Sequence, residues 1–294
     1  MKTYLFAILA ILISNGALGV EASTAKVNQP ISQSVSSDQV KDKLIGQILA
    51  ISGMEHSLQK LPEQIKAGFK GSISRGKIAP DEQRQMLNIY TDAYPEGAFV
   101  ISVRKALESN YDENRYARFL QLISTPLSMR MTKLEAIEPT PVDFRQYISQ
   151  VASHPLTPER IALIQRMDAD TKTSAMMSKI EISTIESNAM AFANDCSDNV
   201  KIKKVIEDKR PEIEKATRST AQVMLAFTYR DVSDADLNEY LKTYEDKDGK
   251  WVQDFVQKAI EKQFDSSIET EAKGMKLFAE SHRPKKTMFA PKCD

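Results

Sequence analysis

The segment from Tyr244 to Phe255 places two aspartates at a spacing that occurs in calcium-binding loops. Asp246, Asp248 and Gly249 fit the third, fifth and sixth positions of the twelve-residue EF-hand loop. The first and last positions hold Tyr244 and Phe255, where calcium requires an acid and a bidentate glutamate. A turn between two helices is therefore the favoured interpretation, and we predict no metal site here.

Other groups that could do chemistry are scattered along the chain. The three histidines, His56, His154 and His282, lie far apart and lack the spacing of a zinc motif. Segment 71–76 has neither the Gly-x-Ser-x-Gly spacing of a nucleophile elbow nor the Gly-Lys-Ser/Thr ending of a phosphate loop. No two carboxylates stand out as an acid and a base. The sequence therefore predicts no catalytic residue and no cofactor, and it favours a protein that is not an enzyme.

The beginning of the chain has the pattern of an export signal. Lys2 precedes an apolar run from Leu5 to Ile13, and Ala22 supplies a small residue at a cleavage position. The apolar run is much shorter than the ~20 residues that a membrane-spanning helix needs. We therefore predict a cleavable signal peptide over residues 1–22, a periplasmic or secreted location, and no stable membrane insertion after cleavage.

The predicted export bears on the two cysteines, Cys196 and Cys293, because exported proteins can form disulfide bonds. An even number of cysteines in an exported protein favours a disulfide bond. This bond would close a loop of about a hundred residues, for which loop entropy predicts roughly 4–5 kcal/mol of stabilisation. It would hold the C-terminal tail against a helix near Cys196. Two free thiols are the alternative.

Composition restricts both the fold and the partners. The 40 basic and 40 acidic residues balance, which argues against a nucleic-acid-binding protein because such proteins carry an excess of Lys and Arg. The 10 glycines and 12 prolines are few, whereas residues that favour helix are abundant. The fold class we predict is all-α, as one or more antiparallel helical bundles.

The spacing of apolar residues indicates where the helices lie. In the stretch 40–51, apolar residues recur at helical period on one face. Proline and small polar residues mark most of the other boundaries. We expect Pro62 to kink its helix or mark a new start, and Pro211 to interrupt a helix. The expected helices are about 38–52, 54–70, 80–94, 95–109, 112–123, 125–137, 142–151, 158–168, 170–195, 198–228, 233–245 and 248–281.

This pattern suggests two helical halves separated by a proline-rich stretch. We assign the regions as signal peptide 1–22, flexible leader 23–37, helical half 38–138, connector 139–157, helical half 158–281 and C-terminal tail 282–294. The halves show weak similarity to each other. Residues 116–128 and 237–249 can be aligned so that their apolar positions coincide, with leucine at both Leu120 and Leu241.

The same two segments resemble a family of bacterial periplasmic proteins called domain of unknown function 2059. The second copy has Val232-Ser233 at the helix cap, Asp236-Leu237 at an acid-Leu pair, and Gly249 at the end of the motif. Its Ser-Pro is replaced by Asp246-Lys247, whereas the first copy has Thr125-Pro126 there and Ser128 in place of the glycine. The resemblance covers about 40–140 and 158–275. It implies an exported helical protein with two degenerate copies, and it implies no activity.

Four methionines are the remaining feature with a functional interpretation. Met167, Met176, Met177 and Met190 follow a loosely helical spacing, which is typical of core packing or of an adaptable apolar groove for a peptide. We therefore expect a non-enzymatic protein that binds an envelope protein or peptide through a groove between helices. One alternative is a structural envelope protein without a ligand. The other is a hydrolase with dispersed carboxylates, which two converging carboxylates in a cleft would indicate.

Overall fold

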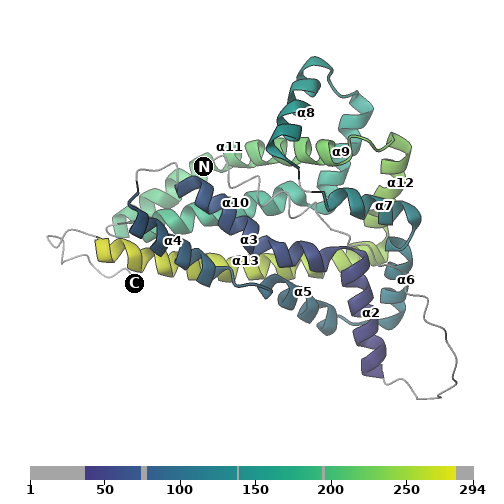
Figure 1. Ribbon diagram of the computed structural model, residues 1–294, viewed down its shortest axis with the longest axis horizontal. Helices are drawn as coiled ribbons and strands as arrows, with labels where there is room; N and C mark the ends of the chain where they lie inside the picture. The colour runs from purple at the N-terminus through teal and green to yellow at the C-terminus, as the bar shows by residue number, and fades with distance from the viewer. Residues whose placement is uncertain (1–36, 74–77, 138, 194–195, 283–294) are drawn as a thin grey trace.

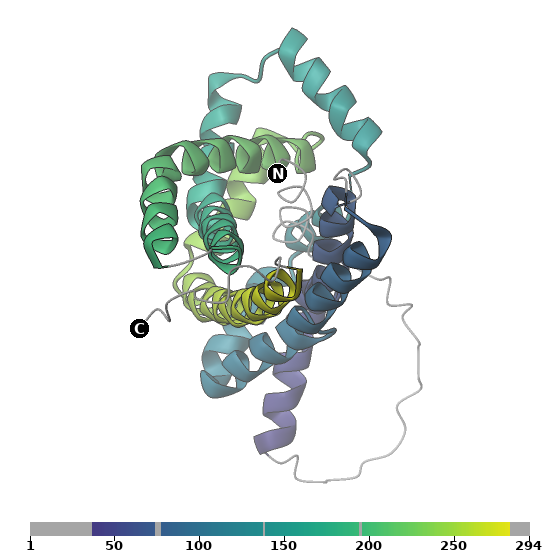
Figure 2. The same ribbon diagram turned by 90° about the vertical axis from the view of Figure 1, so that its left-hand side faces the viewer.

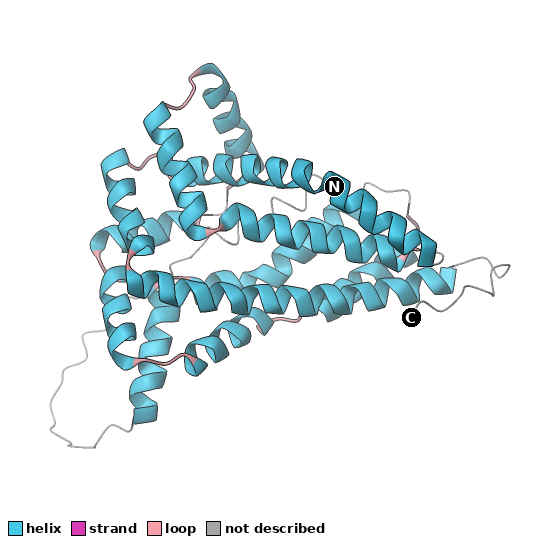
Figure 3. Ribbon diagram, turned by 180° about the vertical axis from the view of Figure 1, so that it is seen from behind, coloured by secondary structure: helices cyan, strands magenta, loops and turns pink. Residues whose placement is uncertain are grey.

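The computed structural model describes residues 37–73, 78–137, 139–193 and 196–282. In these ranges the only regular structure is α-helix, which confirms the all-α prediction (Figure 3). The predicted signal peptide, most of the leader and the tail beyond His282 lie outside the described residues. The helices are α2 (Ser37–Ile51), α3 (Met54–Ile73), α4 (Pro80–Ala93), α5 (Ala98–Ser109), α6 (Glu113–Ile123), α7 (Pro126–Glu135), α8 (Pro141–Ser153), α9 (Pro158–Thr171), α10 (Thr173–Ala191), α11 (Cys196–Thr228), α12 (Asp234–Glu245) and α13 (Lys247–His282).

Short polar side chains fix the starts of several helices. Thr125, Thr140 and Thr157 each precede a proline at the first helical position, and each side-chain oxygen accepts the backbone N–H three residues on. Threonine thereby satisfies an amide that the helix leaves free, while proline lacks the N–H that would have no partner. Asp112 and Ser233 cap α6 and α12 in the same way. These local signals explain why most predicted helix starts agree closely with the structure.

Local signals mislead where packing or backbone conformation dominates. The prediction that Pro211 interrupts its helix is wrong, because α11 continues through it. Pro211 is exposed and removes only one N–H from the helix, while α11 packs extensively along α10. Helix α3 also continues through Pro62. Helix α5 begins at Ala98 rather than at Pro95, because Gly97 adopts a left-handed φ of 75° immediately before it.

The buried apolar side chains form two cores. The first core lies among α2, α3, α4, α5, α6, α10 and α13, and the second lies among α7, α8, α9, α12, one side chain of α10 and the end of α11. These cores do not coincide with the two halves expected from the sequence. Helices α10 and α13 come from the second half but join the first core, whereas α7 joins the second. Helix α8, within the expected connector, buries Phe144 and Tyr147 in the second core.

The long helices determine how these cores are arranged. Helices α3, α10 and α13 run along the long axis, α2 and α6 lie across one end, and α8 rises from the side (Figure 1). Helix α13 packs against α4, α5, α6 and α10, and the end-on view places it between α10 and α4 (Figure 2). The aligned segments of the predicted repeat lie in different cores, with Tyr116 buried in the first and Leu237 in the second.

An ion cluster ties the start of α13 to α6. The Asp248 side chain is 3% exposed, and its two oxygens accept from Nε of Arg115 and Nε of Arg118, each at 2.6 Å. The guanidinium of Arg115 also lies over the ring of Trp251, 3.9 Å from its centroid. The hydrogen bond from Arg118, assisted by Arg115, lowers the pKa of Asp248 to about 2. The cluster therefore holds a permanent charge at the junction of two helices.

Replacing Asp248 with asparagine is expected to lower the free energy of unfolding by about 2 kcal/mol, because charged hydrogen bonds become neutral ones. The loss stays below that of a fully buried pair, since the Arg115 and Arg118 side chains are 28% and 49% exposed and can be hydrated. Urea unfolding at pH 7 measures it. The matched control is Asp254→Asn on α13, where a half-exposed pair with Lys172 predicts a change within about 0.5 kcal/mol. Equal effects of the two variants would contradict the prediction.

Candidate functional site

The residues singled out by type and spacing do not assemble into one site. Cys196 begins α11, while Cys293 lies outside the described residues, so the disulfide stays a prediction. His154 follows α8 and His282 ends α13, both exposed, and His56 lies on α3. Among the described residues, no three His, Cys, Asp or Glu side chains are grouped as metal ligands.

The segment that resembles a calcium loop is the junction of α12 and α13, as predicted. The Asp246 Oδ1 accepts the backbone N–H of Asp248 at 2.8 Å and that of Gly249 at 3.4 Å. The carboxylate of Asp248 is occupied by the two arginines described above. Both aspartates therefore have structural partners, one at the helix start and the other between helices.

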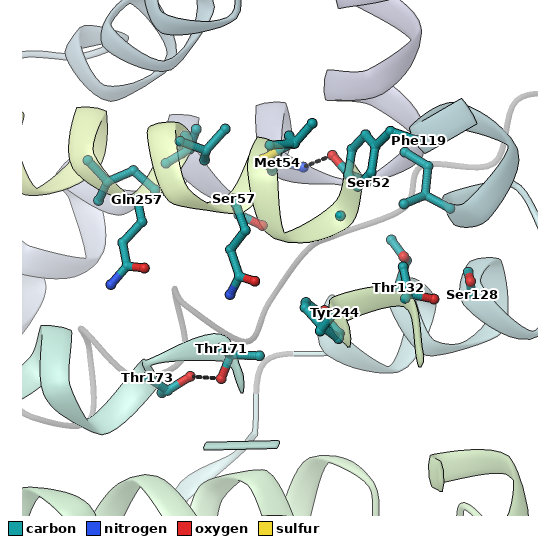
Figure 4. A pocket seen from close by; sticks show the side chains of 18 of the residues that line it. Ser52, Met54, Ser57, Phe119, Ser128, Thr132, Thr171, Thr173, Tyr244 and Gln257 are labelled. Atoms are coloured by element: carbon teal, nitrogen blue, oxygen red, sulfur yellow. Dashed lines mark hydrogen bonds between the residues drawn. The ribbon is translucent and has the colours of Figure 1, made fainter. Parts of the chain in front are cut away.

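Two cavities lie beside α13, and we name the first the central cavity. It has a volume of about 180 Å³ and lies between the two cores, where α3, α6, α7, α12 and α13 meet the start of α10 (Figure 4). Its walls are apolar side chains interrupted by hydroxyl and amide groups, and none of its lining residues is charged. The lining includes Ser52, Met54, Ser57, Leu58, Leu61, Phe119, Ile123, Ser128, Thr132, Thr171, Thr173, Met176, Tyr240, Tyr244, Val252, Val256, Gln257 and Ile260.

Most polar groups of the central cavity have partners in the protein. The hydroxyl of Ser57 donates to the Gly53 carbonyl, and the hydroxyls of Thr171 and Thr173 share a hydrogen bond of 2.6 Å. Gln257 differs. Its Nε2 donates to Glu261, but its buried Oε1 has no partner among the described residues. In Figure 4 the Gln257 side chain extends from α13 into the space beside α10, so an unsatisfied acceptor is buried in the wall of the cavity.

The second cavity, which we name the Glu271 cavity, has a volume of about 330 Å³ and lies among α3, α4, α10 and α13. The Glu271 side chain in its wall is almost completely buried. Its Oε2 accepts from the Tyr94 hydroxyl at 3.0 Å, and its Oε1 accepts from Asn188 Nδ2 at 2.9 Å. Burial raises the pKa of Glu271, while the hydrogen bonds from Tyr90, Asn188 and Tyr94 act in the opposite direction.

A second carboxylate, Glu181, also lines the Glu271 cavity. It lies on α10 and accepts from the Thr217 hydroxyl of α11 at 2.9 Å, and burial raises its pKa. Glu271 is held instead by α4 and the distal part of α10. Asn188 is seven residues beyond Glu181, so these anchoring points are about 10 Å apart along the helix. The arrangement resembles two separately held acceptors more than an acid and base acting on one bond.

Another buried carboxylate lies behind the central cavity. Glu135, at the end of α7, accepts from the hydroxyls of Tyr229 and Tyr240. Tyr240 also contacts Tyr244 through their hydroxyls at 3.0 Å, and both tyrosines line the central cavity. Burial raises the pKa of Glu135 to about 7 despite the two hydrogen bonds. Nothing in the sequence around Glu135 distinguishes it from a surface glutamate at the end of a helix.

The four methionines lie in the core, in cavity walls or, for Met190, half-buried on α10, and their role in binding a peptide stays a prediction. Met167 is fully buried in the second core, whereas Met176 lines the central cavity and Met177 lines the Glu271 cavity. Sequence reasoning therefore identified part of the apolar lining. It missed Gln257, Asn188 and Glu271, because helical periodicity indicates which face is buried but not which partners a polar group finds there.

Comparisons with known proteins give no relative. No family model, curated protein or solved structure matches this chain. The resemblance to domain of unknown function 2059 therefore stays a prediction from the sequence. Within the described ranges, no helix combines the length and the apolar character needed to cross a membrane.

Proposed function

We propose that this chain is an exported, non-enzymatic helical protein that binds an envelope protein or peptide by receiving one apolar side chain in the central cavity. The observation that carries the proposal is an uncharged apolar cavity between two cores with an unsatisfied acceptor, Gln257 Oε1, in its wall. Export depends on the predicted signal peptide, and a periplasmic location follows from it.

The volume sets the size of the group that fits. An engineered apolar cavity of ~150 Å³ in another protein holds a benzene molecule, so about 180 Å³ suits one aromatic or branched aliphatic side chain. Burying such a side chain contributes about 1.5–3 kcal/mol. The uncharged lining favours a neutral anchor and offers no charged group for acid–base catalysis.

Gln257 supports a peptide rather than a plain hydrocarbon. A peptide supplies one backbone N–H beside each side chain, and a buried amide oxygen without a partner is stabilised when it accepts that hydrogen. The cavity is also lined by both cores, with Leu58 and Val252 from the first and Tyr240 from the second. A bound segment would therefore contact both cores.

The proposal predicts a selective effect of removing the Gln257 amide. N-acetyl-phenylalaninamide, which has backbone-like N–H groups, should bind Gln257→Leu about fivefold to tenfold more weakly than wild type. Toluene, which has none, should bind both proteins alike. Calorimetric titration measures both affinities, and Gln263→Leu, outside the cavity on α13, serves as the matched control.

The natural partner is then sought with the same variants. Protein recovered from the exported fraction, whose mass also tests removal of residues 1–22, should retain a specific envelope protein or peptide. Val256→Phe, which fills part of the cavity, should lose it. If neither probe binds and no partner depends on the cavity, the proposal fails and the structural role without a ligand is favoured.

A further inference from the structure

The polar groups that line the Glu271 cavity are dominated by acceptors. Glu181, Asn188 and Glu271 supply carboxylate and amide oxygens, and none of the lining residues is Lys, Arg or His. The hydroxyls of Tyr90 and Tyr94 are directed to Glu271. The cavity therefore resembles a site for a group that donates hydrogen bonds and carries positive charge.

Asn188 gives an independent indication of such a ligand. Its Nδ2 is occupied by Glu271 Oε1, but its buried Oδ1 has no partner among the described residues. Because both atoms belong to one planar amide, the free oxygen lies close to the Glu271 carboxylate. An ammonium group has three N–H donors, so it can contact both oxygens at once.

The burial of Glu271 also favours a positively charged ligand. Its side chain is almost completely buried, and the hydrogen bonds that reach it come from neutral groups of α4 and α10. A buried carboxylate without a cation is unfavourable, and a bound cation compensates for the lost hydration. Burial accordingly raises the pKa of Glu271.

The apolar walls of the Glu271 cavity indicate the size and character of the rest of the ligand. Phe69, Ile180, Phe264 and Met275 contribute apolar surface from three helices, α3, α10 and α13. A volume of about 330 Å³ is at the small end of ligand-binding cavities. A long charged chain would leave these walls unfilled, whereas an apolar body carrying one ammonium group matches them.

We propose that the Glu271 cavity binds a small apolar primary amine, with its ammonium between Glu271 and Asn188 and its apolar body against Phe69, Phe264 and Met275. This site is separate from the central cavity, and the amine is a second ligand rather than the peptide anchor proposed above. A lysine side chain of a peptide shares the ammonium chemistry but lacks the apolar body.

Four probes distinguish these possibilities in calorimetric titrations of the full chain at pH 7.5. The cation 2-phenylethylamine should bind at least tenfold more tightly than its neutral analogue 2-phenylethanol, and phenylacetate should not bind detectably. N-acetyl-lysine amide should bind more weakly than 2-phenylethylamine, and the reverse order would overturn the assignment to a small apolar amine.

Two variants test whether the preference for the amine over the alcohol arises in the Glu271 cavity. Glu271→Gln should abolish the preference for the amine over the alcohol, whereas Glu269→Gln should retain it, because this exposed side chain pairs with Lys273 on the same helix. If Glu271→Gln does not fold, Thr184→Phe provides the second test. Thr184 is a half-buried cavity residue, and filling the cavity from its position should remove amine binding.

Equal affinity for the amine and the alcohol would overturn the proposal. A preference for the amine that survives Glu271→Gln, or amine binding that survives Thr184→Phe, would also overturn it, as would no binding of the amine by wild type. None of these results depends on the central cavity, so the two proposals fail independently.

Discussion

Replacing Gly249 with alanine is expected to lower the free energy of unfolding by about 3 kcal/mol or more. An added Cβ at this position would lie 2.0 Å from the carbonyl oxygen of Thr243 and 3.2 Å from its carbonyl carbon. Both are backbone atoms of α12, so the clash cannot be relieved by a side-chain rotation. Guanidinium unfolding measures the loss.

The α12–α13 junction leaves little freedom for the backbone to move. The Asp246 N–H donates to the Lys242 carbonyl at 2.9 Å, and the Asp246 side chain accepts from the first turn of α13. Asp248 is fixed to α6 by the two arginines. A shift that accommodates a Cβ at Gly249 would therefore disturb contacts of both cores.

The matched control is Gly46→Ala in the middle of α2. No heavy atom lies within 4 Å of a Cβ built on Gly46, so this substitution should stabilise the protein by about 1 kcal/mol through helix propensity. Opposite signs for the two glycines are expected. If Gly249→Ala were as stabilising as Gly46→Ala, the close approach of α12 and α13 would be contradicted.

These positions illustrate what the sequence can and cannot predict. Thr157 before Pro158 and Ser233 before Asp234 are signals that act within a few residues, so they predict helix starts correctly. Pro211 is also a local signal, but the packing of α11 on α10 outweighs it. Gly249 is recognisable in the sequence as a motif glycine, whereas its contact with Thr243 depends on the angle between two helices.

The division of the cores shows a different limit. The helices α10 and α13 were predicted, but the helices they pack against were not, because the spacing of apolar residues carries no information about partners distant in sequence. Helix α13 packs against α4 and α5, although the predicted connector separates it from them in the sequence. The candidate sites could not be predicted for the same reason, because Asn188 and Glu271 meet only when α10 and α13 pack together.

Buried Glu135 should give the protein a pH-dependent stability that Glu135→Gln lacks. Burial raises the pKa of Glu135 from its ordinary value of 4.5 to about 7 in the folded protein. Between these values the folded state retains a proton that the unfolded state has released, so stability falls as pH rises. The contribution is fully present below about pH 4.5 and is lost as pH passes about 7.

The expected loss is about 3 kcal/mol, at ~1.4 kcal/mol for each unit of pKa difference. Solvent does not reduce this figure, because Glu135 is buried and its Oε2 has no partner among the described residues. Urea unfolding of wild type and Glu135→Gln at pH 4.5 and pH 8 measures it. The variant should gain about 3 kcal/mol relative to wild type between the two pH values.

Subtracting the free energy of unfolding of Glu135→Gln from that of wild type isolates the contribution of Glu135 from those of other acids. Burial also raises the pKa values of Glu181 and Glu271, but both proteins contain these residues, so their contributions cancel. The control is Glu239→Gln on α12, where an exposed carboxylate pairs with Lys242, and its difference from wild type should change little with pH. Parallel pH curves for wild type and Glu135→Gln would show that the pKa of Glu135 is the same in the folded and the unfolded protein. The hydrogen bonds from Tyr229 and Tyr240 would then cancel the effect of burial, contrary to the balance inferred here.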